Sequence, residues 1–358
     1  KPLFKDDKID RTMPQFSPDG KELAYVEGRC RLMVKNIETG KVRQITDGSQ
    51  HYSTDGSMEF AWSPDNKWFA LSYTGNRHDP YSDVGIVSAQ GGKVANLTNT
   101  GYFDYEPQWV LDGNAILFSS DRYGMRSHAS WGSLNDVMII YLNRKAYELA
   151  QMSKEEYELY TEAEKKAKEA EKKSADKGAD KKPEAKVEDI VVELDNIEDR
   201  IVRLTPNSGS LSSFTMDKKG ENLYYIMSYE GKFDLWQMNL RKRDNKALHR
   251  SIGSGSLAWD KKMENMFLLG GQMKKLKGGS GAPTPIAVRG DMELDRAAER
   301  EYMFDRVYRQ EKARFYHKDM HGVDWDAMRD NYVRFLPHID NNYDFAEMLS
   351  EWLGELNV

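Results

Sequence analysis

The feature that most constrains this chain is a short phrase that returns at a regular interval. Phe16-Ser17-Pro18-Asp19-Gly20 leads into the apolar run Leu23-Ala24-Tyr25. Trp62-Ser63-Pro64-Asp65-Asn66 leads in the same way into Phe69-Ala70-Leu71. Proline presets φ at the second position of a turn, aspartate can bond its own backbone, and glycine or asparagine accepts a left-handed conformation. Each copy therefore predicts that a tight turn and then a strand follow the aromatic residue. Looser copies begin at Trp109, Phe214 and Trp259.

The spacing of the copies indicates what the repeat builds. The interval is 46 residues from Phe16 to Trp62, 47 from Trp62 to Trp109 and 45 from Phe214 to Trp259. Periods of about 40–50 residues with several short strands per unit are typical of β-propeller blades. We therefore predict a mainly β fold, with five visible blades over residues 14–289 and a small α-helical domain over 290–358. The number five also leaves open an incomplete propeller, in which one or two blades precede residue 1.

The third blade is expected to carry a large insertion. The interval from Trp109 to Phe214 is 105 residues, which is one blade plus about 58 residues. The surplus falls at about 146–188, a stretch rich in Lys, Glu and Ala that predicts a solvated helix grading into a disordered tether. The blade should resume with a strand at Ile190–Leu194 and close at Arg200–Thr205. That phrase ends in Leu-Thr, and Gln44-Ile45-Thr46 and Asn96-Leu97-Thr98 are taken as equivalent positions.

The period of the apolar residues changes from 2 to 3.6 at Asp291. A long helix is expected to reach about Phe315, with one face marked by Leu294, Ala298, Tyr302, Phe304, Val307, Tyr308 and Phe315. Asp324 is expected to cap a second helix from Trp325 to about Leu336, which Pro337 ends or kinks. Asp344 is expected to cap a third helix, from Phe345 to about Leu353.

Composition excludes some classes of function. The chain has 358 residues and a formal net charge of −6, and no basic patch alternates with aromatic residues, so no nucleic-acid partner is predicted. No apolar run approaches the length of about 18 residues that a membrane span needs. The single Cys30 cannot form an internal disulfide and is expected to serve packing. The chain does not begin with Met, so the lack of a signal peptide carries little weight.

Candidate site residues are few, and each also has a structural explanation. Arg122, Arg126 and His128 lie in one predicted loop and are candidates for binding an anionic group at the propeller mouth, against the alternative of ordinary surface. The surrounding stretch 127–132 combines Ser with His but lacks a nucleophile elbow, which favours an inter-strand loop. The aspartates at equivalent positions of the repeat are expected to build turns rather than a ring of ligands: Asp19, Asp65, Asp112 and Asp217.

The segment His317-Lys318-Asp319-Met320-His321 is the most tempting local cluster for a metal. It could place three ligands in one turn, but no fourth ligand is evident nearby and Gly322 marks a tight connection. A loop between helices is therefore favoured, and no metal and no cofactor are predicted. A metal-dependent hydrolase at His317 and His321 is kept as a minor alternative.

The C-terminal third resembles a known family. The phrases that carry the resemblance are Glu301–Gln310, Phe315-Tyr316, Met320–Trp325, Tyr343-Asp344-Phe345, Glu347-Met348-Leu349 and Gly354-Glu355-Leu356. They resemble the helical C1 module of the tricorn-type serine peptidases, which belong to the clan of the C-terminal processing peptidases. Upstream, Ser130–Ser133 and Asp195–Arg200 resemble the last propeller of the same family.

The resemblance implies a peptidase of which this chain is one part. Such proteins have two propellers, this helical module, a PDZ domain and a catalytic core, and they cut short peptides that the propellers are thought to channel. Their mechanism uses a serine nucleophile and a histidine base that follows Gly-Glu-Leu within a few residues. Here Asn357-Val358 follow instead, and none of His317, His321 or His338 matches the base. No catalytic residue is therefore predicted in this chain, which should be inactive by itself.

The expected partners follow from the same resemblance. They are peptide substrates, the PDZ and catalytic domains of the same protein, and a second copy as a further alternative. Bacterial relatives imply a periplasmic or exported protein and the archaeal type a cytoplasmic one. The main alternative is a non-enzymatic β-propeller that binds a partner in the cell envelope. It is motivated by the repeat, and it leaves the helical module unexplained.

Overall fold

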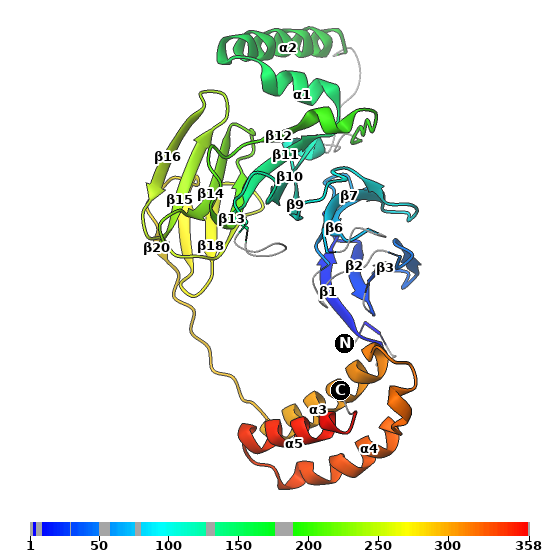
Figure 1. Cartoon of the computed structure of the whole chain (residues 1–358). Coiled ribbons are helices and arrows are strands. Elements are labelled where there is room, and N and C mark those ends of the chain that lie inside the picture. The colour runs from blue at the N-terminus through cyan, green and yellow to red at the C-terminus, as the bar shows by residue number, and fades with distance from the viewer. Residues whose placement is uncertain are drawn as a thin grey trace. The chain divides into compact units, whose positions relative to one another are not determined.

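Five four-stranded antiparallel sheets follow one another along the chain, and a group of helices comes after them (Figure 1). The computed structural model describes residues 3–4, 9–28, 30–49, 58–75, 80–126, 133–175 and 189–356. The chain divides into two units, Lys1–Ile286 and Ala287–Val358, which are described separately. The predicted fold class, propeller blades followed by a small helical domain, is confirmed.

Each sheet is a simple meander in which consecutive strands pair. The first is formed by β1 (Arg11–Phe16), β2 (Glu22–Glu27), β3 (Arg31–Asn36) and β4 (Val42–Gln44), and the second by β5 (Phe60–Trp62), β6 (Trp68–Tyr73), β7 (Asp83–Ser88) and β8 (Ala95–Asn96). The third is formed by β9 (Asp104–Val110), β10 (Ala115–Ser120), β11 (Asp136–Tyr141) and β12 (Ile201–Arg203). The fourth is formed by β13 (Ser210–Met216), β14 (Asn222–Ser228), β15 (Phe233–Asn239) and β16 (Asp244–His249), and the fifth by β17 (Ser256–Trp259), β18 (Asn265–Leu269), β19 (Lys274–Lys277) and β20 (Thr284–Pro285).

The aspartates of the repeat build the turns between the first two strands of a blade. Asp19 Oδ1 accepts from the Ser17 hydroxyl at 2.7 Å and from the Lys21 backbone N–H at 3.1 Å. Asp65 repeats both contacts, and Asp217 accepts from the Glu221 N–H at 2.9 Å. Asp112 is different, because it lies with φ +52° in the short 3₁₀ helix η1 (Leu111–Gly113). The predicted structural role is confirmed at the other three positions.

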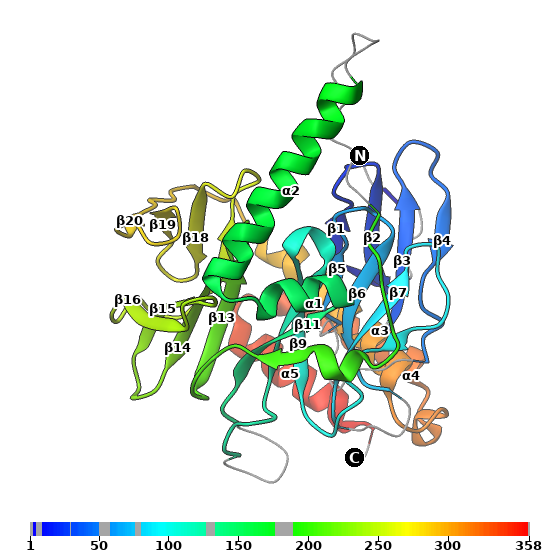
Figure 2. The same ribbon diagram turned by 90° about the horizontal axis from the view of Figure 1, so that it is seen from above.

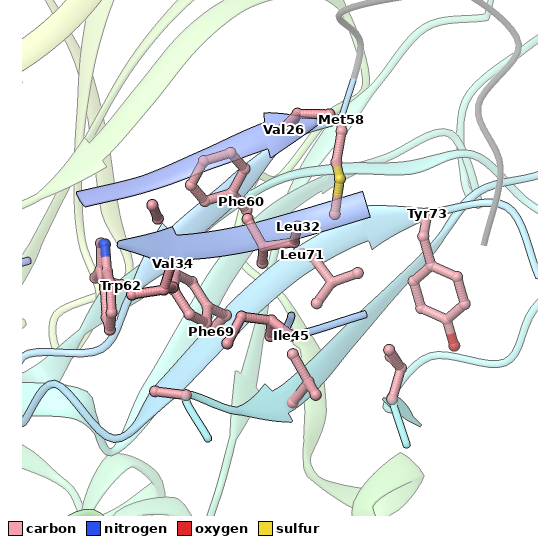
Figure 3. Packing of buried hydrophobic residues seen from close by; sticks show 14 residues of the cluster. Val26, Leu32, Val34, Ile45, Met58, Phe60, Trp62, Phe69, Leu71 and Tyr73 are labelled. Atoms are coloured by element: carbon pink, nitrogen blue, oxygen red, sulfur yellow. The ribbon is translucent and has the colours of Figure 1, made fainter. Parts of the chain in front are cut away.

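The core of the first unit lies between neighbouring sheets. Figure 3 shows the cluster between the first two blades, in which Val26 and Leu32 face Phe60, Phe69 and Leu71. Further clusters join the second blade to the third, the third to the fourth and the fourth to the fifth. Successive residues of a strand point to opposite faces of its sheet. An inner blade can therefore pack apolar side chains against both of its neighbours.

The aromatic residues of the second to fifth repeats pack toward the preceding blade. The Trp62 indole donates to the Gln15 carbonyl at 3.4 Å, the Trp109 indole donates to the Ala61 carbonyl at 3.0 Å, and Phe214 is fully buried. Phe16 of the first repeat differs, because 62% of its surface is exposed. Its blade is the first of the chain, so the described residues include no preceding sheet to receive it.

The closing Thr residues occupy equivalent positions, as predicted. The hydroxyls of Thr46, Thr98 and Thr205 accept from the backbone N–H groups of Leu32, Val84 and Val137 at 3.0, 3.1 and 3.2 Å. In the second and third blades a buried aspartate completes the contact, since Asp83 and Asp136 accept from the Thr98 and Thr205 hydroxyls. The outermost strand is thereby tied to its neighbour in each of these blades.

The insertion in the third blade contains two helices where the sequence predicted one. They are α1 (Arg144–Gln151) and α2 (Lys154–Ala175), and α2 extends beyond the sheets (Figure 2). The side chain of Asn143 caps α1, and Ser153 and Glu156 form a capping box that starts α2. Arg241 donates to the Leu149 and Met152 carbonyls and lies over the Tyr157 ring, so it holds the helix pair to the fourth blade. The predicted tether at 176–188 lies outside the described residues.

The expected strand at Ile190–Leu194 is wrong, because this segment pairs with no strand. Its apolar residues Ile190 and Val192 pack into the core between the second and third blades. Buried Arg200, in the 3₁₀ helix η2 (Ile197–Arg200), donates to carbonyls of Tyr141, Asp195, Asn196 and Glu193. The hydrogen bonds of the Arg200 side chain thus take the place of the strand-to-strand hydrogen bonds that the apolar pattern predicted.

The second unit contains α3 (Arg296–Arg314), α4 (Trp325–Tyr332) and α5 (Asn342–Gly354), with the 3₁₀ helices η3 (Met320–Gly322) and η4 (Val333–His338). Asp324 caps α4 as predicted, and Pro337 lies in η4. The first helix starts later than predicted, because Asp295 caps it. Exposed Leu294, Ala298 and Tyr302 do not belong to its buried face. The cap expected at Asp344 is wrong, because Asn341 accepts from the N–H groups of Tyr343 and Asp344, both at 3.0 Å. Fully buried Trp352 lies at the centre of the helical core.

Candidate functional site

The loop after β10 contains the predicted binding residues Arg122 and Arg126. It starts at Asp121, whose side chain is 1% exposed and accepts from the Phe103 N–H at 3.0 Å and the Ser133 hydroxyl at 2.9 Å. Arg126 pairs with the same carboxylate at 3.4 Å. Asp121 therefore holds the start of the loop in place and pairs with Arg126, one of the two candidate cations.

Aromatic rings surround the Arg126 guanidinium. Its central carbon lies 5.6 Å from the Tyr81 ring centroid and 5.3 Å from that of Tyr102. Partial desolvation opposes the charge, but the hydrogen bond with Tyr81 and the charge of Asp121 hold the pKa of Arg126 above its ordinary value. Loops of the second and third blades thus meet at one cation, which stacks on two rings.

Arg122 differs from Arg126 in its surroundings. Its guanidinium lies 5.7 Å from the ring of Tyr123, and Arg203 approaches the same ring to 5.0 Å. Arg203 is neutralised by buried Asp136 at 2.8 Å. No ion pair of Arg122 occurs among the described residues. The third candidate, His128, lies outside the described residues, as does the Ser-His stretch 127–132.

A second set of charged residues lies on β9 and just before β5, where sequence reasoning found no site. The Glu59 carboxylate accepts from the backbone N–H of Glu106 at 2.5 Å. Glu106 is exposed to solvent at the surface of β9, but desolvation by the surrounding chain and then the charge of Glu59 raise the pKa of its carboxyl group to about 7. Burial raises the pKa of Glu59 as well. A signal was available, because each glutamate stands three residues before the aromatic of its repeat.

Asp104 stands two residues before Glu106 on β9 and is 2% exposed. Burial raises its pKa to about 6, against hydrogen bonds such as the one from the Thr100 hydroxyl at 3.0 Å. Strands β5 and β9 contact each other, so the carboxyl groups of the second and third blades are near neighbours. Among the described residues, carboxyl groups thus lie on or next to the first strands of the second and third blades, and arginines lie in the loop after β10.

The turn between α3 and α4 brings together the residues of the minor metal alternative. His317 Nδ1 bonds the Asp319 carboxylate. His321 has both ring nitrogens engaged, Nε2 with the Tyr316 hydroxyl at 2.6 Å and Nδ1 with the Leu356 carbonyl at 3.2 Å. Across the described part of the chain, no group of three or more His, Cys, Asp or Glu side chains is arranged to hold a metal ion.

The described residues offer no arrangement for nucleophilic catalysis. Among them, His249, His317 and His321 bond carbonyl, carboxylate and tyrosine oxygens, and Cys30 Sγ lies 3.4 Å from the Gly48 carbonyl. Of the helices that the structure describes, none has the length and apolar character that crossing a bilayer requires. What the arrangement can do is bind charged and aromatic groups.

Two family models match the chain. Residues 296–354 match the tricorn protease C1 domain, and residues 7–181 match the TolB β-propeller domain. The matched regions fall in the helical unit and in the first three blades.

Relatives and a solved structure agree with these matches. The chain is 24% identical over 96% of its length to "Tricorn protease homolog 1" of Streptomyces coelicolor and covers 33% of that protein. It is 30% identical to "Tricorn protease homolog" of Saccharolobus solfataricus over 32% of this chain and 10% of that one. A crystal structure of the tricorn protease superposes with a TM-score of 0.68 at 12% identity, over 98% of this chain and 33% of that one, which shows a shared fold. The chain thus spans about a third of the first of these relatives.

Proposed function

We propose that this chain admits and channels peptides toward the catalytic domains of a tricorn-like serine peptidase. Along the chain, the region that matches the tricorn protease C1 domain follows the region that matches the TolB β-propeller domain. The observation that carries the proposal is the C1 match, which follows the blades along the chain, together with the similarity of 96% of this chain to the Streptomyces relative. The chain itself would supply recognition and support, and the nucleophile and base would come from the rest of the protein.

The test of the peptidase assignment compares two lengths of the protein. The full-length protein should cleave short peptides and be labelled by a serine-reactive fluorophosphonate, because an activated serine attacks such reagents. The 358-residue chain is the matched control and should be neither active nor labelled. A full-length protein that is inert toward a diverse peptide library and unlabelled would refute the assignment.

Charge on the propeller supports the channelling role. Peptides carry an ammonium group at one end and a carboxylate at the other. Arg122 and Arg126 suit the carboxylate, and the carboxyl groups of Glu59 and Glu106 suit the ammonium group. We infer that these two sets bind opposite ends of a peptide that approaches along the first strands of the blades.

A kinetic measurement tests the role of the arginines. Arg122→Ala should raise KM for peptides with a free C-terminal carboxylate about 3–10-fold and leave kcat nearly unchanged, because the contact is lost equally in ground and transition states. The same peptides with an amidated C-terminus should show no difference, and Lys275→Ala on β19 is the control for loss of a surface cation. Equal effects of Arg122→Ala on both peptide forms would contradict this assignment.

A second candidate is a non-enzymatic propeller that binds one protein partner, which the TolB-type match over 7–181 favours. Affinity capture with the full-length protein distinguishes the two. One stoichiometric partner together with an absence of fluorophosphonate labelling would support the second candidate.

Two further expectations belong to the proposal. We infer export to the periplasm or the exterior for a bacterial protein and a cytoplasmic location for the archaeal type, which fractionation of the source cells would test. A homo-oligomer is a further alternative, which light scattering of the full-length protein would test.

A further inference from the structure

A cavity of about 580 Å³ lies between the first and second blades, near their outermost strands. Its lining includes Ile45 and Thr46, which follow β4, Val94, which precedes β8, and Tyr73 at the end of β6. All four of these residues are buried. Ligand pockets typically measure about 300–1,000 Å³, so this cavity has the volume for a small molecule.

Contacts between the two blades fix the walls of this cavity. The backbone N–H of Gly92 donates to the Ile45 carbonyl at 3.3 Å. Gly91 has a φ of +91°, and a Cβ atom at this position would lie 2.7 Å from the Gln44 carbonyl oxygen. Only glycine permits this backbone conformation at so close an approach. The turn after β7 therefore packs directly against the end of β4, and the fold itself forms the cavity.

Tyr73 brings a buried hydroxyl to the cavity. The residue is 6% exposed, and its hydroxyl makes no hydrogen bond within the part of the chain that the structure describes. Figure 3 shows its ring at one end of the core cluster, with the hydroxyl on the side away from Met58. Burial and then the charge of Asp83 raise the pKa of Tyr73, so the hydroxyl keeps its proton at neutral pH. Buried polar groups nearly always have a partner, so this hydroxyl indicates a ligand to which it can donate.

Two opposite charges line the same cavity and do not pair with each other. Asp47 Oδ1 accepts from the N–H and the hydroxyl of Ser49 at 2.9 and 2.6 Å, and these bonds hold the pKa of Asp47 below its ordinary value. Exposed Lys93 forms no ion pair and no side-chain hydrogen bond with any residue that the structure describes. An anion and a cation that line one cavity can bind oppositely charged groups of one ligand.

We propose that this cavity binds a small zwitterion with an apolar side chain, in which Asp47 holds the ammonium group, Lys93 holds the carboxylate and Tyr73 donates to a ligand oxygen. Ile45 and Val94 supply apolar contact for the ligand side chain. A short apolar peptide and a free apolar amino acid share this chemistry. The inference goes beyond the proposed function and does not depend on it, because the site lies in this chain alone and uses none of the candidate residues described above.

Methyl-labelled NMR spectra of the 358-residue chain measure the binding. Titration with leucyl-leucine or with free leucine should shift the methyl signals of Ile45 and Val94 until they saturate. The Leu276 methyl signals, in the core between the fourth and fifth blades, should stay unchanged. The ligand that saturates the shifts at the lower concentration identifies the source of the zwitterion. If neither ligand gives a saturable shift up to its solubility limit, the proposal is wrong.

Three substitutions test the assigned contacts. Tyr73→Phe keeps the ring and removes the hydroxyl, so it should raise Kd about 2–10-fold, the usual effect of losing one hydrogen bond. Asp47→Asn and Lys93→Ala should each raise Kd about 2–5-fold, which is typical of an exposed ion pair. Asp244→Asn and Lys275→Ala are the matched controls, since each removes one exposed charge from another blade, and they should leave Kd unchanged.

Ligands with one blocked end assign each charge to its partner. N-acetylated leucyl-leucine has no ammonium group, so Asp47→Asn should no longer affect its Kd. Amidated leucyl-leucine has no carboxylate, so Lys93→Ala should no longer affect its Kd. Equal effects on free and blocked ligands, or an unchanged Kd in all three variants, would overturn the proposal. Fluorophosphonate labelling of the full-length protein tests the proposed function separately, so either claim can fail without the other.

Discussion

Asp104 shows what burial does to a single carboxyl group in this fold. It lies at the start of β9, and its own carbonyl accepts from the hydroxyls of Ser72 and Ser82, both at 3.0 Å. Burial raises the pKa of the carboxyl group from 3.8 to about 6, and the nearby charge of Asp83 adds to the shift. The folded state therefore keeps a proton that the unfolded state loses at lower pH.

The sign of the pH dependence follows from this difference. Between pH of about 4 and about 6 the unfolded state binds fewer protons than the folded state, so stability falls as pH rises. Asp104→Asn should remove that fall. Relative to the unmodified chain, the variant should gain up to about 3 kcal/mol in unfolding free energy between pH 4 and pH 7, since one pKa unit corresponds to about 1.4 kcal/mol. Urea unfolding at the two pH values measures the change.

A surface substitution provides the control for this measurement. Asp244→Asn at the exposed start of β16 should shift the unfolding free energy equally at both pH values. If Asp104→Asn also gives the same shift at pH 4 and pH 7, then the Asp104 carboxyl group is not the source of the pH dependence.

At the scale of single elements, the start of α5 separates two caps that look equivalent in sequence. Asn341 and Asp344 are both good N-cap residues and stand three positions apart. The structure uses Asn341, whose side-chain oxygen accepts two backbone N–H groups, and places Asp344 in the first turn of the helix. The choice depends on where the chain turns after η4.

We expect the two residues to differ in their effect on stability. Asn341→Ala should lower the unfolding free energy of the helical unit by about 1 kcal/mol, because it leaves two N–H groups at the helix start without their acceptor. Asp344→Ala should cost less, about 0.3–0.5 kcal/mol, which is the low end of the usual effect of an acidic side chain in the first turn. Chemical denaturation followed by helical circular dichroism distinguishes them, and the reverse order would place the cap at Asp344.

Other elements show what local pattern leaves undecided. The capping box of Ser153 and Glu156 has its full signature within four residues, yet it lies inside a charged run that we expected to form one helix. The strand expected at Ile190–Leu194 has suitable alternation, but a strand also needs a partner edge. The segment is instead held by the Arg200 side chain, which donates to the Glu193 carbonyl, and its apolar residues pack into the core between the second and third blades. Alternation shows that side chains are buried and does not identify what covers them.

At the scale of the whole molecule, each of the two units has a core of its own. In the helical unit, Trp352 stacks against Phe304 with centroids 4.3 Å apart and against Trp325 at 4.7 Å. A unit of this size buries a small fraction of its surface on folding, so its unfolding free energy is small. Its stability therefore depends on a small number of large side chains.

Removal of Trp352 should test this dependence. Trp352→Ala is expected to cost about 3–5 kcal/mol, which is enough to unfold the helical unit. Amide hydrogen exchange should show loss of protection in α3 to α5, while amides of the blade strands keep theirs. Tyr343→Ala, which removes an exposed aromatic from the same helix, should change neither. Retained protection in α5 of Trp352→Ala would contradict the expectation.

The number of sheets, the turns and the location of the insertion were predictable from the chain alone. These features depend on residues within one repeat, such as Ser17 with Asp19, and a period of about 46 residues adds the order of the blades. The side-by-side position of Glu59 and Glu106 was implicit in the same period, because equivalent residues of neighbouring blades become spatial neighbours.

Only the tertiary structure decided which distant groups meet. The rings of Tyr81 and Tyr102 around Arg126, and the Leu356 carbonyl at His321, join residues that belong to different loops or helices. No local pattern encodes these contacts, because they depend on how sheets and helices pack. The repeat thus determines the scaffold through short-range chemistry, whereas the candidate sites arise where packing brings separate segments to the same place.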